Sequence, residues 1–300
     1  MKFPDSKKFM YFLMTLLVFL WGYEYIAAKN ALAAFLPITL IFFKYIIGMV
    51  FMLILKLVID KRFPLKKTDI PLLVLCAVFG DIFYFAGEYG AMAYLPISVI
   101  TIILAFVPCV SILTEFVLFK SRPSPLMIIG VFVCVFGVAL VIGADFAELF
   151  SGKYIGYLLA FGAVVCWNIY NFLTKKLSGE YKPLDLTFYQ LLCAIILTAP
   201  YAIFNMPQIN TLDISVWTGV IYLGVVSGFV GFLIYVKAIA VIGPTPCSLY
   251  SNFIPVIATL FGWWFLNETI SPLQILGGMI VVSSGVVVIW QKEKCDILYR

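Results

Sequence analysis

The sequence predicts an all-α membrane protein with ten transmembrane helices arranged as two inverted five-helix repeats. Hydrophobic residues make up 64% of the chain and charged residues 12%, and the mean hydropathy is +1.09. These values lie far outside the range of a soluble domain. The apolar runs are long and lack the alternation of a membrane β-strand. A chain of 300 residues has room for about ten spans of roughly 20 residues each.

The apolar runs place the expected helices in two groups of five, with ends uncertain by a few residues. They lie at about 9–30, 37–59, 70–93, 96–119 and 126–143, and then at about 154–176, 185–204, 214–238, 246–266 and 272–290. The first repeat then covers residues 1–147 and the second covers 148–300.

Residues of the first half recur in the second half at a nearly constant spacing of 146 or 147 positions. The matching pairs are Trp21 and Trp167, Lys29 and Lys175, Pro37 and Pro183, Pro108 and Pro255, Pro125 and Pro272, and Gly130 and Gly277. With five spans in each half, the second half crosses the membrane in the opposite sense to the first. Inverted repeats of this kind are typical of secondary transporters that work by alternating access.

The distribution of Lys and Arg predicts that both termini are cytoplasmic. This orientation puts 16 of the 20 basic residues on the inside. The loop at 144–153, which carries Asp145 and Glu148, is then external. We expect a multi-pass protein of the plasma (inner) membrane. The net charge of +5 reflects this topological bias, so it gives no reason to predict nucleic-acid binding.

The sequence offers no catalytic or metal-binding constellation. It contains no histidine, and its seven cysteines are scattered without a C-x-x-C pair, so we expect neither a zinc site nor a redox site. No H-E-x-x-H, G-x-S-x-G or Walker loop is present. We therefore expect a protein that is not an enzyme and that needs no cofactor or metal.

Two sets of residues resemble the EamA branch of the drug/metabolite transporter superfamily. The first is Trp21-Gly22 followed by Lys29; the second, more specific, set is Pro255, Gly262, Asn267-Glu268-Thr269, Pro272, Gln274, Gly277 and Gly285. The resemblance covers nearly the whole chain as two EamA repeats. It implies a metabolite carrier, often an exporter of amino acids or related small molecules, with a central cavity between the halves. The family usually has a small or polar residue where Glu24 stands, which implies a more charged cavity here.

Ionisable residues within the apolar runs are the candidate functional groups, because each costs about 2.5–3.5 kcal/mol at mid-helix unless it finds a partner or water. Counted along the helices, Glu24, Lys44 and Glu88 fall at one level in the outer half of the membrane. An ion pair of Lys44 with either glutamate would leave a spare carboxylate for a substrate amine or a proton. The alternative is a fixed charge network that holds the first three spans together. The other ionisable residues in the runs are Asp81 and Glu115.

Asp81, Tyr84 and Glu88 are spaced to share one helical face, which predicts a cavity lining. Since histidine is absent, Asp81 and Glu88 are the best candidates for proton coupling. The second repeat contributes Tyr235, Tyr250 and Asn252, whose spans pair by pseudosymmetry with the third and fourth. Trp21 and Trp167 are interpreted as packing elements near the repeat interface. Pro108 and Pro255 allow bending inside the fourth and ninth spans.

We therefore expect a secondary transporter, an exporter of small metabolites such as amino acids or related amines, that works by alternating access and draws on proton coupling. An uncoupled facilitator or channel-like permease for small solutes is the alternative. A membrane sensor is disfavoured because hardly any soluble domain is present to pass on a signal. The expected partners are a small-molecule substrate, membrane lipid and protons, in a monomer or homodimer.

Overall fold

The computed structural model describes residues 6–119, 124–143, 153–208, 212–242, 247 and 250–298. Within these ranges all regular structure is helical, which confirms the all-α class. Seven described helices are long and apolar enough to cross a membrane, and three further apolar helices are shorter. Large apolar side chains such as Val58, Phe132 and Phe204 are exposed on the outside of the bundle, as lipid-facing positions require. The count of ten spans and their inversion stay predictions.

The described residues of the first half form nine helical segments. They are α1 (Lys7–Ala31), α2 (Pro37–Ile59), the short 3-10 helix η1 (Lys67–Asp69), α3 (Ile70–Cys76), the π-helix η2 (Ala77–Phe83), α4 (Tyr84–Ala91), α5 (Ile97–Leu104), α6 (Val107–Phe119) and α7 (Pro125–Gly143). The second half forms a matching series. Its members are α8 (Tyr154–Leu177), α9 (Pro183–Phe204), α10 (Ile214–Tyr222), the π-helix η6 (Leu223–Gly231), α11 (Phe232–Ile242), α13 (Ile254–Leu266) and α14 (Pro272–Leu298).

Prolines mark the start of several helices. Pro37 and Pro183 begin α2 and α9, and Pro125 and Pro272 begin α7 and α14. Proline fits the first helical position because its missing N–H would have no helical partner there. The recurring prolines of the two halves therefore set corresponding helix starts.

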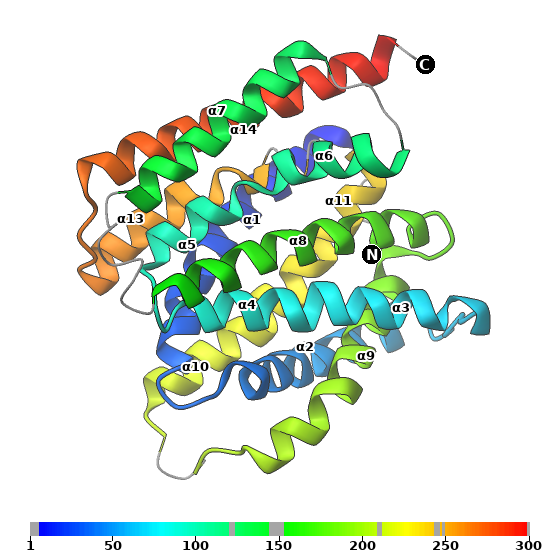
Figure 1. The fold of residues 1–300 in the computed structure, drawn as a ribbon. Helices are drawn as coiled ribbons and strands as arrows, with labels where there is room; N and C mark the ends of the chain where they lie inside the picture. The colour runs from blue at the N-terminus through cyan, green and yellow to red at the C-terminus, as the bar shows by residue number, and fades with distance from the viewer. Residues whose placement is uncertain are drawn as a thin grey trace.

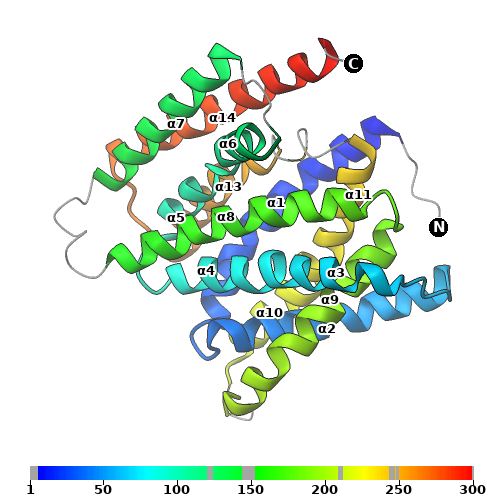
Figure 2. The same ribbon diagram turned by 45° about the vertical axis from the view of Figure 1, so that its right-hand side comes forward.

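Helices of one half pack mainly against helices of the other. The closest inter-half pairs are α7 with α14, α2 with α9, α1 with α13 and α4 with α8. Figures 1 and 2 show α7 and α14 side by side along one edge of the bundle, and α8 alongside α3 and α4. Four fully buried tyrosines lie in the core: Tyr45, Tyr89, Tyr170 and Tyr235. The core thus lies between the two halves.

Two kinds of helix irregularity recur at matching positions in the two halves. The π-helices η2 and η6 interrupt the third and eighth predicted spans. The fourth span is broken at residues 105–106, just before Pro108, and the ninth turns at residues 252–253, just before Pro255. Proline removes a helical N–H donor and disfavours helical geometry in the residue before it. The sequence predicted bending near these prolines, but both breaks are complete interruptions.

Candidate functional site

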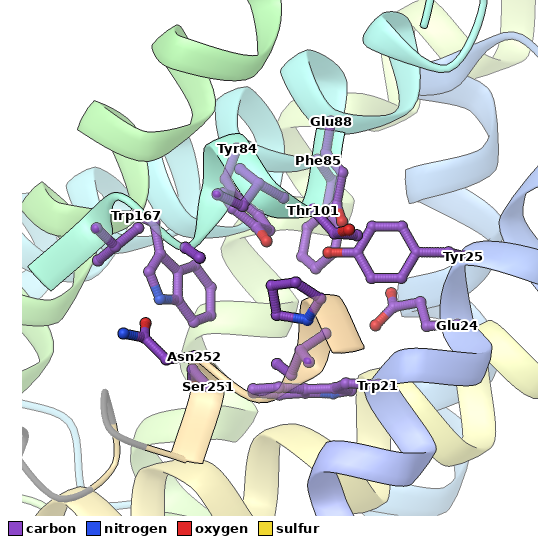
Figure 3. Close-up of a pocket in the computed structure, with 15 residues that line it drawn as sticks. Trp21, Glu24, Tyr25, Tyr84, Phe85, Glu88, Thr101, Trp167, Ser251 and Asn252 are labelled. Atoms are coloured by element: carbon purple, nitrogen blue, oxygen red, sulfur yellow. The ribbon is translucent and has the colours of Figure 1, made fainter. Parts of the chain in front are cut away.

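A cavity of about 60 Å³ lies where the two broken helices meet, bounded also by α1, α4 and α8 (Figure 3). Since one water needs roughly 10–15 Å³, this volume holds a few waters and a larger substrate requires some opening. The lining residues are Trp21, Glu24, Tyr25, Tyr84, Phe85, Glu88, Thr101, Leu104, Ala105, Val107, Trp167, Ser251, Asn252, Ile254 and Pro255. Broken helices in a membrane are tolerated where their backbone is buried in protein or lines a cavity.

Aromatic rings form most of the cavity wall. Trp21 and Trp167 meet edge to face with their ring centroids 6.2 Å apart, and Tyr84 lies 4.6 Å from Trp167. Phe85 and Tyr25 complete the wall on the side of α4 and α1. The face of an aromatic ring carries partial negative charge, so this wall favours apolar and cationic groups.

Glu24 forms an ion pair with a lysine that lies outside the cavity lining. Lys44 on α2, fully buried, donates from Nζ to Oε1 of Glu24 at 2.7 Å. The hydroxyl of Tyr89 also donates to Oε1 of Glu24, at 3.2 Å. The Lys44 ammonium in turn lies 3.4 Å from the centre of the Phe85 ring. Of the two partners that the sequence left open for Lys44, the structure shows Glu24.

Glu88 on α4 is the second carboxyl group of the cavity. It is 2% exposed, and its Oε2 has no hydrogen-bond partner among the described residues. The hydroxyls of Tyr25 and Tyr84 lie beside this carboxyl group (Figure 3). A buried polar atom without a hydrogen-bond partner is costly. Oε2 of Glu88 is therefore a candidate atom for binding a ligand.

The corresponding residues of the second half form neutral contacts in place of charged ones. Gln190 and Tyr170 stand 146 positions after Lys44 and Glu24, and the Tyr170 hydroxyl donates to Oε1 of Gln190 at 3.4 Å. Tyr235 stands 147 positions after Glu88, and its hydroxyl donates to Oδ1 of Asn171 at 3.2 Å. The acidic character of the site therefore comes from the first half alone.

The structure brings four of the eight predicted site residues to the cavity: Glu24, Tyr84, Glu88 and Asn252. Lys44 stands behind the wall as the partner of Glu24. Tyr235 packs behind Trp21 and Trp167, at 5.1 and 5.5 Å between ring centroids. Tyr250 stacks on Tyr11 at 6.0 Å and does not line the cavity. The side chain of Glu115 lies outside the described part of the structure.

The predicted common face of Asp81, Tyr84 and Glu88 is wrong for Asp81. Asp81 lies in the π-helix η2, whose wider turn takes it out of the α-helical register of the other two. It is fully buried away from the cavity lining, where the Tyr45 hydroxyl donates to its Oδ1 at 3.0 Å. Its Oδ2 has no hydrogen-bond partner among the described residues.

Several cavity residues escaped the sequence interpretation. Trp21 and Trp167 do pack between the halves, as expected, but they also line the cavity. Tyr25 could have been found because it lies one turn after Trp21 and next to Glu24 on α1. Thr101 lies shortly before Pro108, so the proline was its signal. No cluster of three or more His, Cys, Asp or Glu side chains gathers as a metal site within the described residues.

Inter-half contacts lie at both ends of the bundle. At one end the 60–69 segment meets the turn between α8 and α9: Lys182 donates to Asp60 and Tyr181 to Asp69, both at 2.8 Å, and Lys66 pairs with Glu180. We call these six residues the loop clasp. Beneath it, Lys56 and Asp185 form a buried ion pair.

At the opposite end Glu268, which follows α13, joins the two halves. Lys29 at the end of α1 donates to its Oε1 at 3.1 Å, and the backbone N–H of Ile97 donates to the same atom at 3.2 Å. The N–H of Ile97 belongs to the first turn of α5, where donors lack helical partners and a negative charge is favoured. The cavity thus lies between two sets of contacts that each join the first half to the second.

These features define a helical membrane protein with a buried polar and aromatic cavity between two halves. The EamA-like transporter family matches residues 8–143 and again residues 154–290, and the chain belongs to this family. It is 22% identical over 281 residues to the uncharacterized transporter YyaM of Bacillus subtilis, covering 89% of this chain and 90% of that protein. It is also 22% identical to a probable terminal-alkyne amino-acid exporter of Streptantibioticus cattleyicolor, over 225 residues that cover 75% and 74% of the two chains. One solved crystal structure has the same fold, with a TM-score of 0.69 and 18% identity over 94% of this chain and 98% of that one.

Proposed function

We propose that this chain is a secondary transporter that exports small metabolites, such as amino acids or related amines, through the central cavity. The observation that carries the proposal is the placement of the cavity: it lies between the two halves, is lined by two broken helices, and has inter-half contacts toward both ends of the bundle. The relative from Streptantibioticus cattleyicolor, described as a probable amino-acid exporter, supports the substrate class and the direction.

The proposed architecture is ten spans in the plasma (inner) membrane, with repeats at 1–147 and 148–300 and both termini cytoplasmic. Matching positions of the π-helices and helix breaks support the repeat. In alternating access the contacts of the loop clasp and the Lys29–Glu268 ion pair would break in turn while the halves rock around the cavity. Both sets of contacts join side chains of the two halves, so a rocking motion would separate the paired side chains.

We further propose that a proton gradient supplies the energy, through the buried carboxyl groups of Asp81 and Glu88. Their positions suit different parts of this task. Glu88 lines the cavity, where it can meet the substrate, whereas Asp81 is sealed beside Tyr45 outside the lining. A buried carboxyl group without a cationic partner can bind either a proton or a cationic ligand, which is what an exchange of the two requires.

Flux into proteoliposomes tests this function. Candidate substrates come from comparing the metabolites of cells that overexpress the protein with those of cells that lack it. Uphill accumulation that requires a pH gradient supports the coupled carrier; equal downhill flux with and without the gradient supports the uncoupled facilitator or channel-like permease. Protein-free liposomes are the control, and absence of flux for every enriched metabolite would contradict transport altogether.

A further inference from the structure

We infer that the substrate is an organic monocation, an amine with an apolar body and no carboxylate, whose ammonium group binds Glu88. This inference rests on the proposed transport function and narrows its substrate class. The first step is the charge of the cavity. Among the described lining residues Glu24 and Glu88 are the acidic groups, and none carries a positive charge. Lys44 lies outside the lining and neutralises Glu24 at 2.7 Å, so one negative charge is left.

Glu88 is the group that holds this charge. It is 2% exposed, and its Oε2 lies without a hydrogen-bond partner among the described residues. A buried carboxylate that lacks a cation is strongly disfavoured, whereas an ammonium group at hydrogen-bond distance compensates it. An ammonium carries N–H donors and no acceptor, which matches an unpartnered acceptor oxygen.

The aromatic wall suits the same ligand. Trp21, Trp167, Tyr84 and Phe85 surround the space next to Glu88. Aromatic faces attract a nearby ammonium and pack against an apolar body. The structure contains an example of this attraction, because the Lys44 ammonium lies 3.4 Å from the centre of the Phe85 ring. Phe85 also lines the cavity.

A substrate carboxylate, by contrast, finds no cation in the described lining. Thr101 and Ser251 already donate their hydroxyls to the backbone carbonyls of Ser98 and Cys247, each at 3.1 Å. Nδ2 of Asn252 and Nε1 of Trp21 have no hydrogen-bond partner among the described residues, but they are neutral donors that lie against Gly285 on α14 and Gly231 on η6. The hydroxyls of Tyr25 and Tyr84 lie beside Glu88 itself. A zwitterion would therefore bring one charge that the described lining does not compensate.

Three ligands of one carbon skeleton test the charge requirement: isobutylamine, valine and 3-methylbutanoate. Binding to the purified protein in detergent is measured as the rise in thermal unfolding temperature, which grows with ligand concentration over Kd. Isobutylamine is expected to raise this temperature, and at least tenfold more valine should be needed for the same rise. 3-Methylbutanoate should give none. Phenethylamine, phenylalanine and 3-phenylpropanoate repeat the comparison with a larger apolar body, in case the cavity opens to a larger volume when a ligand binds.

Three variants assign the effect to Glu88. Glu88→Gln should weaken amine binding at least tenfold, and Glu88→Asp, which keeps the charge on a shorter side chain, should retain the preference for the amine. Asp213→Asn, a loss of an exposed carboxylate before α10, should bind as the wild type does. The unfolding temperatures without ligand show whether each variant is folded, and unchanged amine binding by folded Glu88→Gln would overturn the assignment.

Flux of the same ligands separates this inference from the function on which it rests. If valine is carried as well as isobutylamine, or better, the transporter stands and the monocation is wrong. Failure of both amines to bind or to be carried also overturns the inference. If none of the metabolites enriched in the cell comparison is carried, the proposed transport function itself is wrong.

Discussion

Lys44 and Glu24 form a buried ion pair between α1 and α2, and their counterparts Gln190 and Tyr170 form a neutral hydrogen bond between α8 and α9. The joining atoms are 2.7 Å apart in the first pair and 3.4 Å apart in the second. Both pairs therefore link the first two helices of a half. Since the neutral pair provides the same link, the charges of the first pair are more than a structural necessity.

Replacing Lys44 by Met should strand Glu24 as an uncompensated buried charge and lower the free energy of unfolding by about 3–5 kcal/mol. Adding Glu24→Gln should restore most of that loss, because both charges are then gone. Thermal unfolding of the single and double variants measures this. Tyr170→Phe is the matched control, since it removes a neutral bond worth about 1 kcal/mol. Rescue by Glu88→Gln in place of Glu24→Gln would contradict the pairing.

Asp81 and Glu88 should respond differently to neutralisation. If Asp81 carries the coupling proton, Asp81→Asn should abolish accumulation driven by a pH gradient and leave exchange of labelled for unlabelled substrate intact, because exchange needs no net proton release. Glu88→Gln should impair both, because Glu88 lines the cavity. Proteoliposome accumulation and exchange are measured on each variant. Normal uphill transport by Asp81→Asn would remove Asp81 from coupling.

Gly80 should tolerate no side chain. A Cβ there would meet the ring of Tyr170, with Cε2 at 2.7 Å, across the contact between η2 and α8. Gly80→Ala should cost about 1–3 kcal/mol through overpacking. The control is Gly162→Ala on α8, where nothing lies within 4 Å of the added atom and where alanine should be neutral or stabilising by up to about 1 kcal/mol. Equal unfolding temperatures of the two variants would contradict the close contact of the halves.

The loop clasp should protect Cys76, which is fully buried at the end of α3, the helix that follows the 60–69 segment. Removing two of its pairs with Glu180→Gln and Lys182→Met should speed maleimide labelling of Cys76 in a protein whose other cysteines are replaced. Asp213→Asn, at an exposed site before α10, is the control. Unchanged labelling of the double variant would show that the clasp does not close this end.

Protection by the loop clasp should depend on pH only at the extremes, when the labelling rate of Cys76 at each pH is divided by its rate in the unfolded protein, since maleimide reacts with the thiolate. The hydrogen bond from Lys182 holds the pKa of Asp60 below its ordinary value of 3.8, so this contribution is present above about pH 4 and is lost as pH falls through the lowered pKa. The hydrogen bond to Glu180 raises the pKa of Lys66 above 10.5, and the hydrogen bond to Asp60 does the same for Lys182. The stabilisation from these two lysines is therefore lost only as pH rises above that value. Protection of Cys76 should therefore stay constant from about pH 5 to 9. A change near neutral pH would point to another group.

The topology can be checked with two cysteines. Lys66→Cys and Asp145→Cys should react with a membrane-impermeant maleimide from opposite sides, because five spans and the distribution of basic residues place their loops on opposite faces. Labelling in intact cells and in inside-out vesicles distinguishes the sides. Both sites reacting from one side would contradict the inverted repeat.

The helices were predictable from sequence where hydrophobicity alone decides them. The run at 126–143 corresponds to α7, and Pro37 and Pro183 mark the starts of α2 and α9. The π-helices were not predictable, because one extra residue in a turn leaves hydropathy unchanged while it rotates Asp81 away from Glu88. The partner of Lys44 was likewise open, since spacing places Glu24 and Glu88 at the same depth and only side-chain packing distinguishes them.

The one-sided charge of the cavity bears on the kinetics of the whole cycle. A ligand anchored at Glu88 stays with the first half while the second half, which offers Asn252 and Trp167, moves against it. The two openings then expose the ligand beside different surfaces, so its release rates to the two sides of the membrane need not be equal. The gradients across the membrane still fix the final distribution of the ligand. The rate at which that distribution is reached from each side, however, depends on the residues that each half places beside the ligand.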